Sequence, residues 1–343
     1  MPLDHYITLG RSGLRVSPMC LGTMTFGEDF GWGAPPAECE RIVAEYRARG
    51  GNFIDTANVY TNGHSEEILG ACLQNRDRLV IATKFFCSLT PGDPNAGGAG
   101  RKAIIGQLEA SLRRLKTDYI DLYWLHNWDR TVPVEETMRA LDDLVHDGKV
   151  RYIGFSDMPA WATTHAQVLA MMRGWTPLIA YQAEYSLLER TAEAELVPMA
   201  EQLGMGILAW GPLKNGTLVR RIDEPGKRAA LTGGPTPAQV PIIEAVAAIA
   251  TELSTTPAAV ALAWLRGRPG IAGPILGART HAQLIANLVE IDLPSESRAR
   301  LDAVSAPVLP FPTPYNRHLA PRLAFPGLTI DGVAIDPSPI RRN

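Results

Sequence analysis

The sequence lacks the features that would mark a metal-binding or disulfide-bonded protein. Only four of its 343 residues are cysteines, none of them forms a C-x-x-C pair, and none stands near a pair of histidines. Such spacing would be needed for a zinc site or a redox dithiol. We therefore expect reduced thiols and no bound metal.

Signals for membranes and nucleic acids are missing as well. No stretch reaches the roughly 18 consecutive apolar residues of a spanning helix, and the N-terminus, MPLDHYITLGRSG, has no basic segment followed by an apolar one. The 33 Lys and Arg are balanced by 36 Asp and Glu and are scattered along the chain, which argues against a nucleic-acid footprint. We expect a cytoplasmic protein that binds neither membranes nor nucleic acids.

The glycine fingerprint G-x-G-x-x-G after an early strand, typical of a doubly wound dinucleotide-binding sheet, is also absent. What the chain does contain is a regular alternation of short apolar runs and helical segments, and we count eight such units. Strands that alternate with helices indicate a parallel sheet, and eight units favour a closed (β/α)8 barrel. We predict one domain, residues 1–343, with the barrel core at about 18–290.

The expected elements follow from apolar runs, turn residues and helix start signals. Strands are predicted at 18–24, 51–55, 79–84, 119–126, 150–156, 177–182, 205–210 and 273–276, and helices at 35–49, 64–73, 101–115, 134–145, 159–172, 191–203, 239–253 and 280–288. Residues 6–9 and 14–17 predict a hairpin ahead of the barrel.

A proline-rich extension follows at about 305–343, where prolines exclude long helices. Apolar side chains lie between these prolines, enough to dock the segment on a barrel. We favour a lid over the substrate site. Packing against the side of the barrel or against a neighbouring subunit is the alternative.

Proton-active side chains stand where three of the predicted strands end. Asp55 closes one apolar run, Lys84 the next and His126 the third, and Tyr60 follows Asp55 by five residues. Each has an ordinary structural explanation when taken alone, such as a cap or an interior histidine. Catalytic groups of a barrel come from the C-terminal ends of strands, however, and a buried carboxylate needs a cation such as Lys84. We expect all four side chains at one rim.

The local sequences FIDTANVY, VIATK and YIDLYWLHNWD resemble signatures of the aldo-keto reductases. In that family Asp, Tyr, Lys and His occur in the same order on three successive strands of a (β/α)8 barrel, whose bottom is plugged by a hairpin. The resemblance covers residues 6–288. It implies reversible reduction of aldehydes or ketones by NADPH, with Tyr60 as general acid, Lys84 lowering the pKa of Tyr60, Asp55 orienting Lys84, and His126 orienting the carbonyl oxygen.

The resemblance also implies a set of cofactor-binding residues. Ser156 and Gln182 would hold the nicotinamide carboxamide and Trp210 would stack on the ring, although a helix cap and core packing are ordinary alternatives for Ser156 and Trp210. Asp157 stands where the family usually has Asn, and its ionised form can only accept hydrogen bonds. The full set is Gly22, Thr23, Met24, Asp55, Ser156, Asp157, Gln182, Trp210, Gly211, Pro212, Leu213, Lys214, Gly216, Leu218, Gly277, Arg279, Gln283 and Asn287.

Two cations in this set suit the phosphates of NADPH. Lys214 lies in a loop whose backbone N–H groups could hold the pyrophosphate. Arg279 stands at a helix start, and its fork suits the 2′-phosphate that NADPH carries and NADH lacks. Gln283 and Asn287 share one face of that helix.

The resemblance places substrate contacts at Tyr60, His126, Trp32, Phe86 and Trp128 and favours a small-molecule carbonyl compound with an aromatic or aliphatic body. Trp32 could equally pack its loop onto the rim. An alternative function is that of an NADP(H)-binding regulatory or sensor subunit like the potassium-channel β subunits, which share this fold and can retain the four residues. The sequence leaves open whether the protein is a homo-oligomer.

Overall fold

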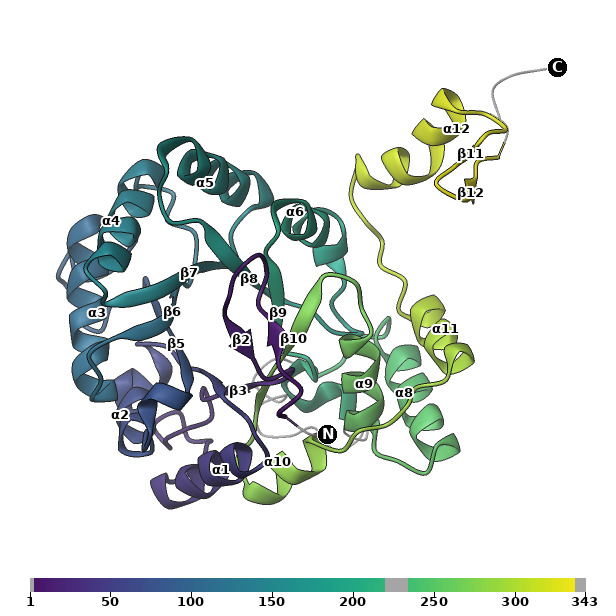
Figure 1. Cartoon of the computed structure of the whole chain (residues 1–343). Helices are drawn as coiled ribbons and strands as arrows, with labels where there is room; N and C mark the ends of the chain where they lie inside the picture. The colour runs from purple at the N-terminus through teal and green to yellow at the C-terminus, as the bar shows by residue number, and fades with distance from the viewer. Residues whose placement is uncertain (1–2, 220–233, 337–343) are drawn as a thin grey trace.

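The computed structural model describes residues 3–219 and 234–336 of the chain. Eight parallel strands close into a barrel in the order β10-β3-β4-β5-β6-β7-β8-β9 (Figure 1). They are β3 (Cys20–Gly22), β4 (Phe53–Asp55), β5 (Val80–Phe85), β6 (Ile120–Leu125), β7 (Val150–Ser156), β8 (Leu178–Glu184), β9 (Gly206–Trp210) and β10 (Ile271–Gly277). The predicted (β/α)8 barrel is confirmed.

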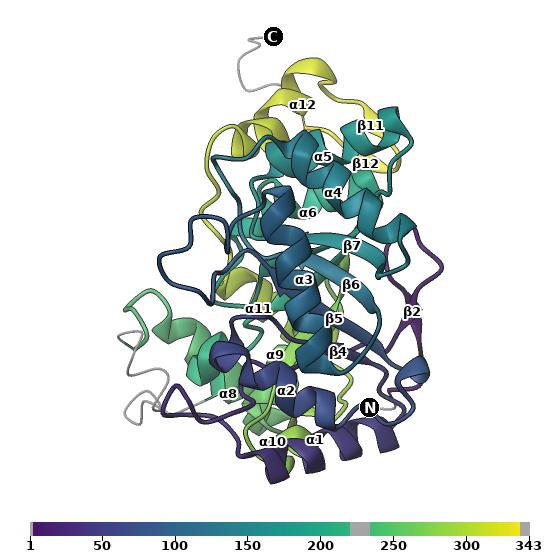
Figure 2. The same ribbon diagram turned by 90° about the vertical axis from the view of Figure 1, so that its left-hand side faces the viewer.

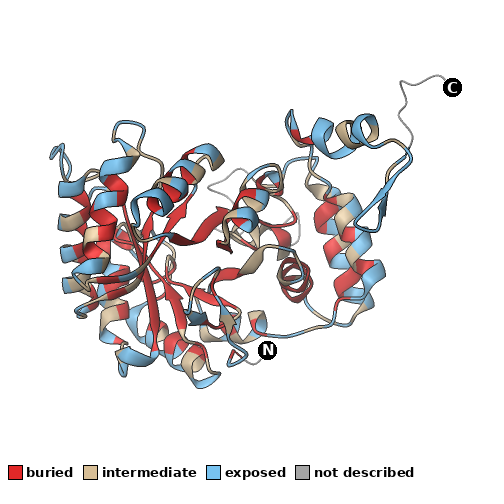
Figure 3. Cartoon of the chain, turned by 45° about the horizontal axis from the view of Figure 1, so that its top comes forward, coloured by how far each residue is buried: buried red, intermediate tan, exposed pale blue. Residues whose placement is uncertain are grey.

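The strands are nearly continuous apolar runs because side chains on both of their faces are buried. All six residues of β5 are buried, for example. Inward-facing side chains fill a barrel of this size, and outward-facing ones pack under the helices. Figure 3 shows this burial concentrated in the strands and on the inner faces of the helices.

The helices surround the barrel, and α3 runs along its outside next to β5 and β6 in the side view of Figure 2. Their bounds are α1 (Pro36–Ala48), α2 (His64–Ala71), α3 (Arg101–Leu115), α4 (Val134–His146), α5 (Ala160–Arg173), α6 (Leu196–Leu203), α8 (Val240–Glu252), α9 (Pro257–Arg266), α10 (His281–Asn287), α11 (Ser295–Val304) and α12 (Ala320–Ala324). In α3, Ile104, Leu108 and Leu115 are buried on one stripe, as an amphipathic surface helix requires.

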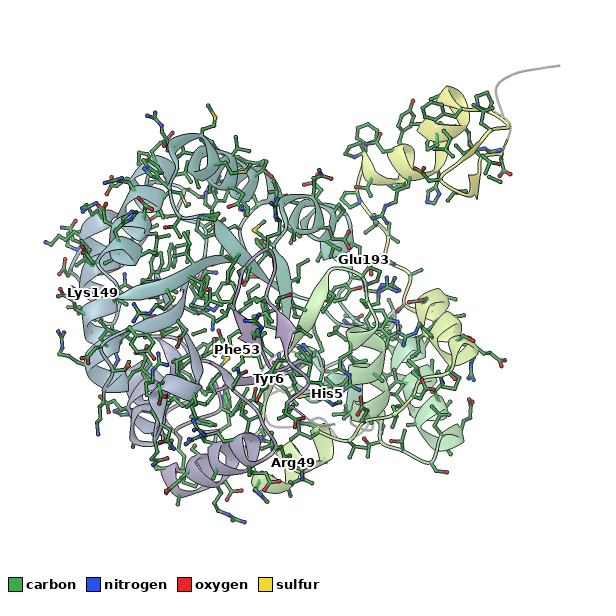
Figure 4. All side chains as sticks on the ribbon, in the orientation of Figure 1. His5, Tyr6, Arg49, Phe53, Lys149 and Glu193 are labelled. Atoms are coloured by element: carbon green, nitrogen blue, oxygen red, sulfur yellow. The ribbon has the colours of Figure 1, made fainter. Side chains whose placement is uncertain are left out.

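A hairpin of β1 (Ile7–Thr8) and β2 (Arg15–Val16) lies across the N-terminal end of the barrel, in front of it in Figure 1. Leu9 and Val16 pack with the interior of the barrel. The turn needs Gly10, since its φ is +56° and a Cβ there would lie 2.2 Å from the carbonyl oxygen of Ile179. The expected plug is therefore present. Tyr6, labelled in Figure 4, donates to the carbonyl oxygen of Gly50 at 2.9 Å.

Several predicted boundaries are wrong: β3 is shorter than 18–24 at both ends, and β10 begins at Ile271 rather than at 273. Two further differences have an evident cause. The helix expected at 191–203 is divided into a short turn (Thr191–Glu193) and α6, because Pro198 is tolerated only in the first turn of a helix. The strand expected to end at Gln182 continues to Glu184, which pairs with Trp210 of β9.

Among the described residues, three helices were not predicted: α9, α11 and the five-residue α12. Eight of the ten residues of α9 are buried, so the helix has no polar face from which a helical period could be read. It packs against β10, with α8 on its outer side. Among the described residues, no single helix is long and apolar enough to cross a bilayer; α8 and α9 meet the length and composition criteria only as a pair, bent by 102°.

The C-terminal extension stands apart from the barrel in Figures 1 and 3. As expected, its helices are short: a five-residue segment (Tyr315–Leu319) and α12, followed by the two-residue strands β11 (Thr329–Ile330) and β12 (Val333–Ala334). Arg317 anchors it by donating to the carbonyl oxygen of Glu193 at 2.6 Å, and Figure 4 labels Glu193 at this edge of the barrel.

Candidate active site

A buried lysine lies at the centre of the C-terminal rim of the barrel. Lys84 in β5 and Asp55 at the end of β4 are both almost inaccessible to solvent and form an ion pair between Nζ and Oδ2. Lys84 Nζ also donates to the carbonyl oxygen of Thr56 at 2.8 Å and to Tyr60 Oη at 3.0 Å. All three amine protons are thereby used. The pairing expected from the two strand ends is present, and Gln182 adds a contact from its amide to Asp55 Oδ1 at 3.3 Å.

The other two side chains meet above this pair. Tyr60 and His126 contact edge to face, with ring centroids 6.0 Å apart and planes at 79°. His126 follows β6, and its backbone N–H donates to the carbonyl oxygen of Phe85 at 3.1 Å. Its Nδ1 is buried and has no hydrogen-bond partner among the described residues. The four predicted side chains therefore lie together.

The electrostatics of this group differ in one respect from the prediction. Lys84 does pull the pKa of Tyr60 down, but burial raises it more, and the net pKa of Tyr60 lies above its ordinary value. The expected downward effect of Lys84 on that pKa is present, but in the protein alone burial outweighs it. Burial works against charge on Lys84, yet Asp55 and Tyr60 together raise its pKa, so the lysine keeps its proton. Burial, with a smaller contribution from Lys84, lowers the pKa of His126 to about 3.

A cavity of about 710 Å³ opens beside these side chains and extends to α10. Among the predicted residues, the following line it: Gly22, Met24, Asp55, Tyr60, His126, Ser156, Asp157, Gln182, Trp210, Gly211, Pro212, Leu213, Gly216, Gly277, Arg279, Gln283 and Asn287. This volume is in the range of small-molecule and cofactor sites.

Three predicted cofactor residues lie elsewhere. Thr23 is fully buried, and its backbone N–H donates to the backbone carbonyl oxygen of Asp55 at 2.9 Å. Leu218 packs in the core beside α8. Lys214 forms an ion pair with Glu184 instead of facing the cavity. This cation is therefore partnered within the chain, and its contact with a pyrophosphate stays a prediction.

One wall of the cavity is formed by the ends of β7, β8 and β9. Ser156 Oγ is buried and has no hydrogen-bond partner among the described residues. Asp157 has a positive φ of 50°, a conformation that Asp tolerates better than most residues, and its backbone N–H donates to Gln182 at 3.1 Å. Trp210 Nε1 donates to Asp157 Oδ1 at 3.0 Å. Desolvation by the surrounding protein raises the pKa of Asp157 to about 6, and the hydrogen bond from Trp210 works against this shift. The side chain is nevertheless open to the cavity.

The far end of the cavity carries Arg279, just before α10. Its backbone N–H donates to Gln283 Oε1 at 2.9 Å, and Thr280 caps the helix by accepting from the Gln283 N–H at 3.1 Å. No carboxylate pairs with the Arg279 guanidinium among the described residues. Gln283 and Asn287 lie on the same wall, as predicted.

The predicted aromatic substrate residues Trp32, Phe86 and Trp128 do not line this cavity within the described chain. Trp32 packs at 5.8 Å from Phe30, which does line it. Trp128 packs edge to face with Trp161, at 5.2 Å and 85°. Their part in substrate binding stays a prediction.

Several residues of the site were not identified from the sequence. Thr25 lines the cavity and donates from Oγ1 to the carbonyl oxygen of Ala278 at 2.7 Å, which ties the first strand to the last. Asn215 lines it from a left-handed backbone conformation, with φ of 56°. Glu184 holds Lys214. Of these three residues, only Asn215 has a local sequence signal, because Lys-Asn-Gly is typical of a turn.

The expected lid is not present in the described residues, because none of the cavity-lining residues comes from the extension. Apolar side chains of the extension are largely exposed instead, including Phe311 at 82%. Its contacts with the barrel lie beside α6, where Arg317 meets Glu193.

Comparison with known proteins extends these observations. A model of the Aldo/keto reductase family matches residues 18–306. The chain is 39% identical over 309 residues to an uncharacterized oxidoreductase, YrpG, of Bacillus subtilis, covering 85% of this chain and 93% of that protein. It is 35% identical over 302 residues to the norsolorinic acid reductase of Aspergillus flavus, covering 84% and 77%. It is 34% identical over 307 residues to an aryl-alcohol dehydrogenase [NADP(+)] of Phanerodontia chrysosporium, covering 82% and 80%.

Proposed function

The chain belongs to the aldo/keto reductase family, and on that premise we propose that it reduces aldehydes or ketones to alcohols with NADPH, reversibly, using Tyr60 as general acid. Family membership supports an NADP-dependent oxidoreductase that acts on a small molecule through a nicotinamide cofactor. The hydrogen bond from Lys84 to Tyr60 is the observation that carries the finer proposal.

The residues of the cavity fit such a cofactor. Ser156 Oγ has no geometric hydrogen-bond partner among the described residues, which supports its accepting a hydrogen bond from an amide group of the cofactor. Gly22 lines the cavity without a side chain. A Cβ at this position would lie 2.8 Å from the side chain of Ile275. The guanidinium of Arg279 suits a phosphate group in geometry and charge. We infer that Ser156, Asp157, Gln182 and Trp210 hold the nicotinamide end, and Arg279, Gln283 and Asn287 the adenosine end.

In the reaction, bound NADPH supplies a hydride to the carbonyl carbon. Tyr60 Oη donates its proton to the oxygen on which negative charge develops, and the Lys84 ammonium at 3.0 Å stabilises the tyrosinate that remains. Asp55 keeps the lysine charged and aimed at Tyr60.

His126 is less suited to be the acid. With its pKa lowered to about 3, it is a neutral imidazole at neutral pH, whereas Tyr60, whose pKa is raised, holds a proton there. A neutral imidazole can still hydrogen-bond a carbonyl oxygen. We therefore assign His126 to orienting the substrate and Tyr60 to proton donation.

The proposal is tested by measuring NADPH consumption against a panel of aliphatic and aromatic aldehydes and ketones. We expect turnover with part of the panel and product alcohol in amounts equal to the NADPH consumed. A protein that binds NADPH tightly but consumes none with any carbonyl compound would contradict the enzyme assignment and favour a cofactor-sensing subunit.

A further inference from the structure

The charges around the cavity do not cancel at its nicotinamide end. Asp55 is paired with Lys84, and Glu184 is paired with Lys214. Asp157 also faces the cavity, but the side chains that act on it by hydrogen bonding, Trp210 and Ser156, are neutral, and among the described residues no cation lies within ion-pair distance of it. One negative charge is therefore left without an opposite charge.

The position of this carboxylate is fixed before any ligand binds. The backbone N–H of Asp157 donates to the backbone carbonyl oxygen of Gln182 at 3.1 Å. Trp210 Nε1 donates to the Asp157 carboxylate at 3.0 Å. Both contacts come from neighbouring strands of the barrel. A charge held in this way costs little reorganisation when a charged group binds beside it.

A nicotinamide ring differs in charge between its two redox states. The oxidised ring is cationic and the reduced ring is neutral, whereas the rest of the cofactor is the same. A fixed anion beside the ring therefore attracts one state and is nearly indifferent to the other. An asparagine would fill the same space without this discrimination.

We propose that Asp157 makes the site bind NADP⁺ more tightly, relative to NADPH, than a neutral residue would, and that it thereby shifts the equilibrium between the bound species toward NADP⁺ and alcohol, the products of carbonyl reduction. The inference rests on the proposed function, because it places the nicotinamide beside Asp157. In the favoured direction, the carbonyl carbon would receive a hydride from NADPH and its oxygen the proton of Tyr60, which solvent then replaces. The products are the alcohol and NADP⁺, and one proton is consumed.

The effect depends on pH because Asp157 titrates. Its pKa is raised to about 6, so the carboxylate is neutral well below pH 6 and charged above it. The titratable and charged groups that act on it are Glu184, Lys84, Tyr60 and Tyr181, with Lys214 paired to Glu184. Preference for NADP⁺ should therefore rise between pH 5 and pH 7.5.

The experiment is calorimetric titration of the full chain with NADP⁺ and with NADPH at several pH values. The ratio of the two Kd values is the readout, since the 2′-phosphate is common to both cofactors and its titration cancels. Asp157→Asn should weaken NADP⁺ about tenfold, a change of about 1.4 kcal/mol, leave NADPH nearly unchanged and flatten the pH dependence of the ratio. Asp77→Asn, an exposed acid at the other end of the barrel, removes the same charge and should change neither Kd.

The outcomes separate the two proposals. Equal weakening of both cofactors, or no change in the ratio, would overturn the role of Asp157 while leaving cofactor binding intact. A ratio in the unaltered protein that does not depend on pH between 5 and 7.5 would overturn it without any variant. Failure of both cofactors to bind the unaltered protein would overturn the proposed function itself.

Discussion

The two ends of the cavity differ in how their polar groups are partnered. Around Lys84 the three amine protons all bind atoms of the chain, and Asp55 is doubly contacted. Toward the cofactor wall, Ser156 Oγ has no partner and Arg279 has no carboxylate among the described residues. At the first end every donor of Lys84 is satisfied and only His126 Nδ1 lacks a partner among the described residues, whereas the second end is left for a ligand.

This difference predicts that substitutions at the two ends will have different effects on folding, turnover and cofactor affinity. Substitutions at the first end remove contacts that also hold the fold, because a buried charge is left without its partner. Substitutions at the second end remove contacts that form only when a ligand binds. The first kind should affect turnover and folding, and the second should affect affinity.

The largest effect is expected for Lys84→Met, which leaves the Asp55 carboxylate buried and unpaired. Breaking a buried pair costs about 3 to 5 kcal/mol in the free energy of unfolding, and the loss of assisted proton transfer should lower kcat by at least ~10²-fold. Because the pKa of Lys84 is raised in the fold, its stabilisation is fully present below the unfolded pKa of about 10.4 and is lost only as the pH rises through the folded value.

Denaturant titration and steady-state kinetics measure both changes at pH 7. Lys102→Met, an exposed lysine on α3, is the matched control and should have little effect on either. Unaltered stability in Lys84→Met would show that Asp55 and Lys84 are not coupled as the structure has them.

A smaller effect, confined to affinity, is expected for Arg279→Ala. A charge-assisted hydrogen bond is worth about 1.5 to 3 kcal/mol, so the Kd for NADPH should rise roughly 10- to 150-fold. The Kd for NADH and the free energy of unfolding should hardly change. Titration with both cofactors decides the matter, and equal weakening of NADH would assign Arg279 to the pyrophosphate or to the helix start.

The smallest effect is expected from removing residues 311–343. Since no described residue of the extension lines the cavity, KM values for small and for bulky carbonyl compounds should stay unchanged within error. A selective rise in KM for bulky substrates would restore the lid interpretation. A change in assembly size, measured by light scattering, would point to a contact between subunits.

Much of this arrangement was predictable because it depends on local sequence. Apolar runs that end in Asp55, Lys84 and His126 identify three barrel strands and the rim they share. The predicted helices other than α6 begin and end within two residues of their expected positions, because caps, prolines and glycines act locally.

Features that depend on contacts between distant residues were not predictable. The partner of Lys214 is Glu184, 30 residues earlier, and nothing in the loop sequence indicates it. The bond between Trp210 and Asp157 joins strand ends 53 residues apart. The net pKa of Tyr60 depends on burial, which outweighs the nearby Lys84 charge and is known only from the packed structure. For α9, complete burial removed the amphipathic pattern.

The proton donor is the central claim, and Tyr60→Phe tests it most directly because the substitution removes only the hydroxyl group. Single-turnover and steady-state kinetics, together with NADPH titration, should show kcat lowered ~10²- to 10⁴-fold with the Kd for NADPH unchanged. Turnover near that of the unaltered protein across several aldehydes would contradict the assignment of Tyr60 as the acid.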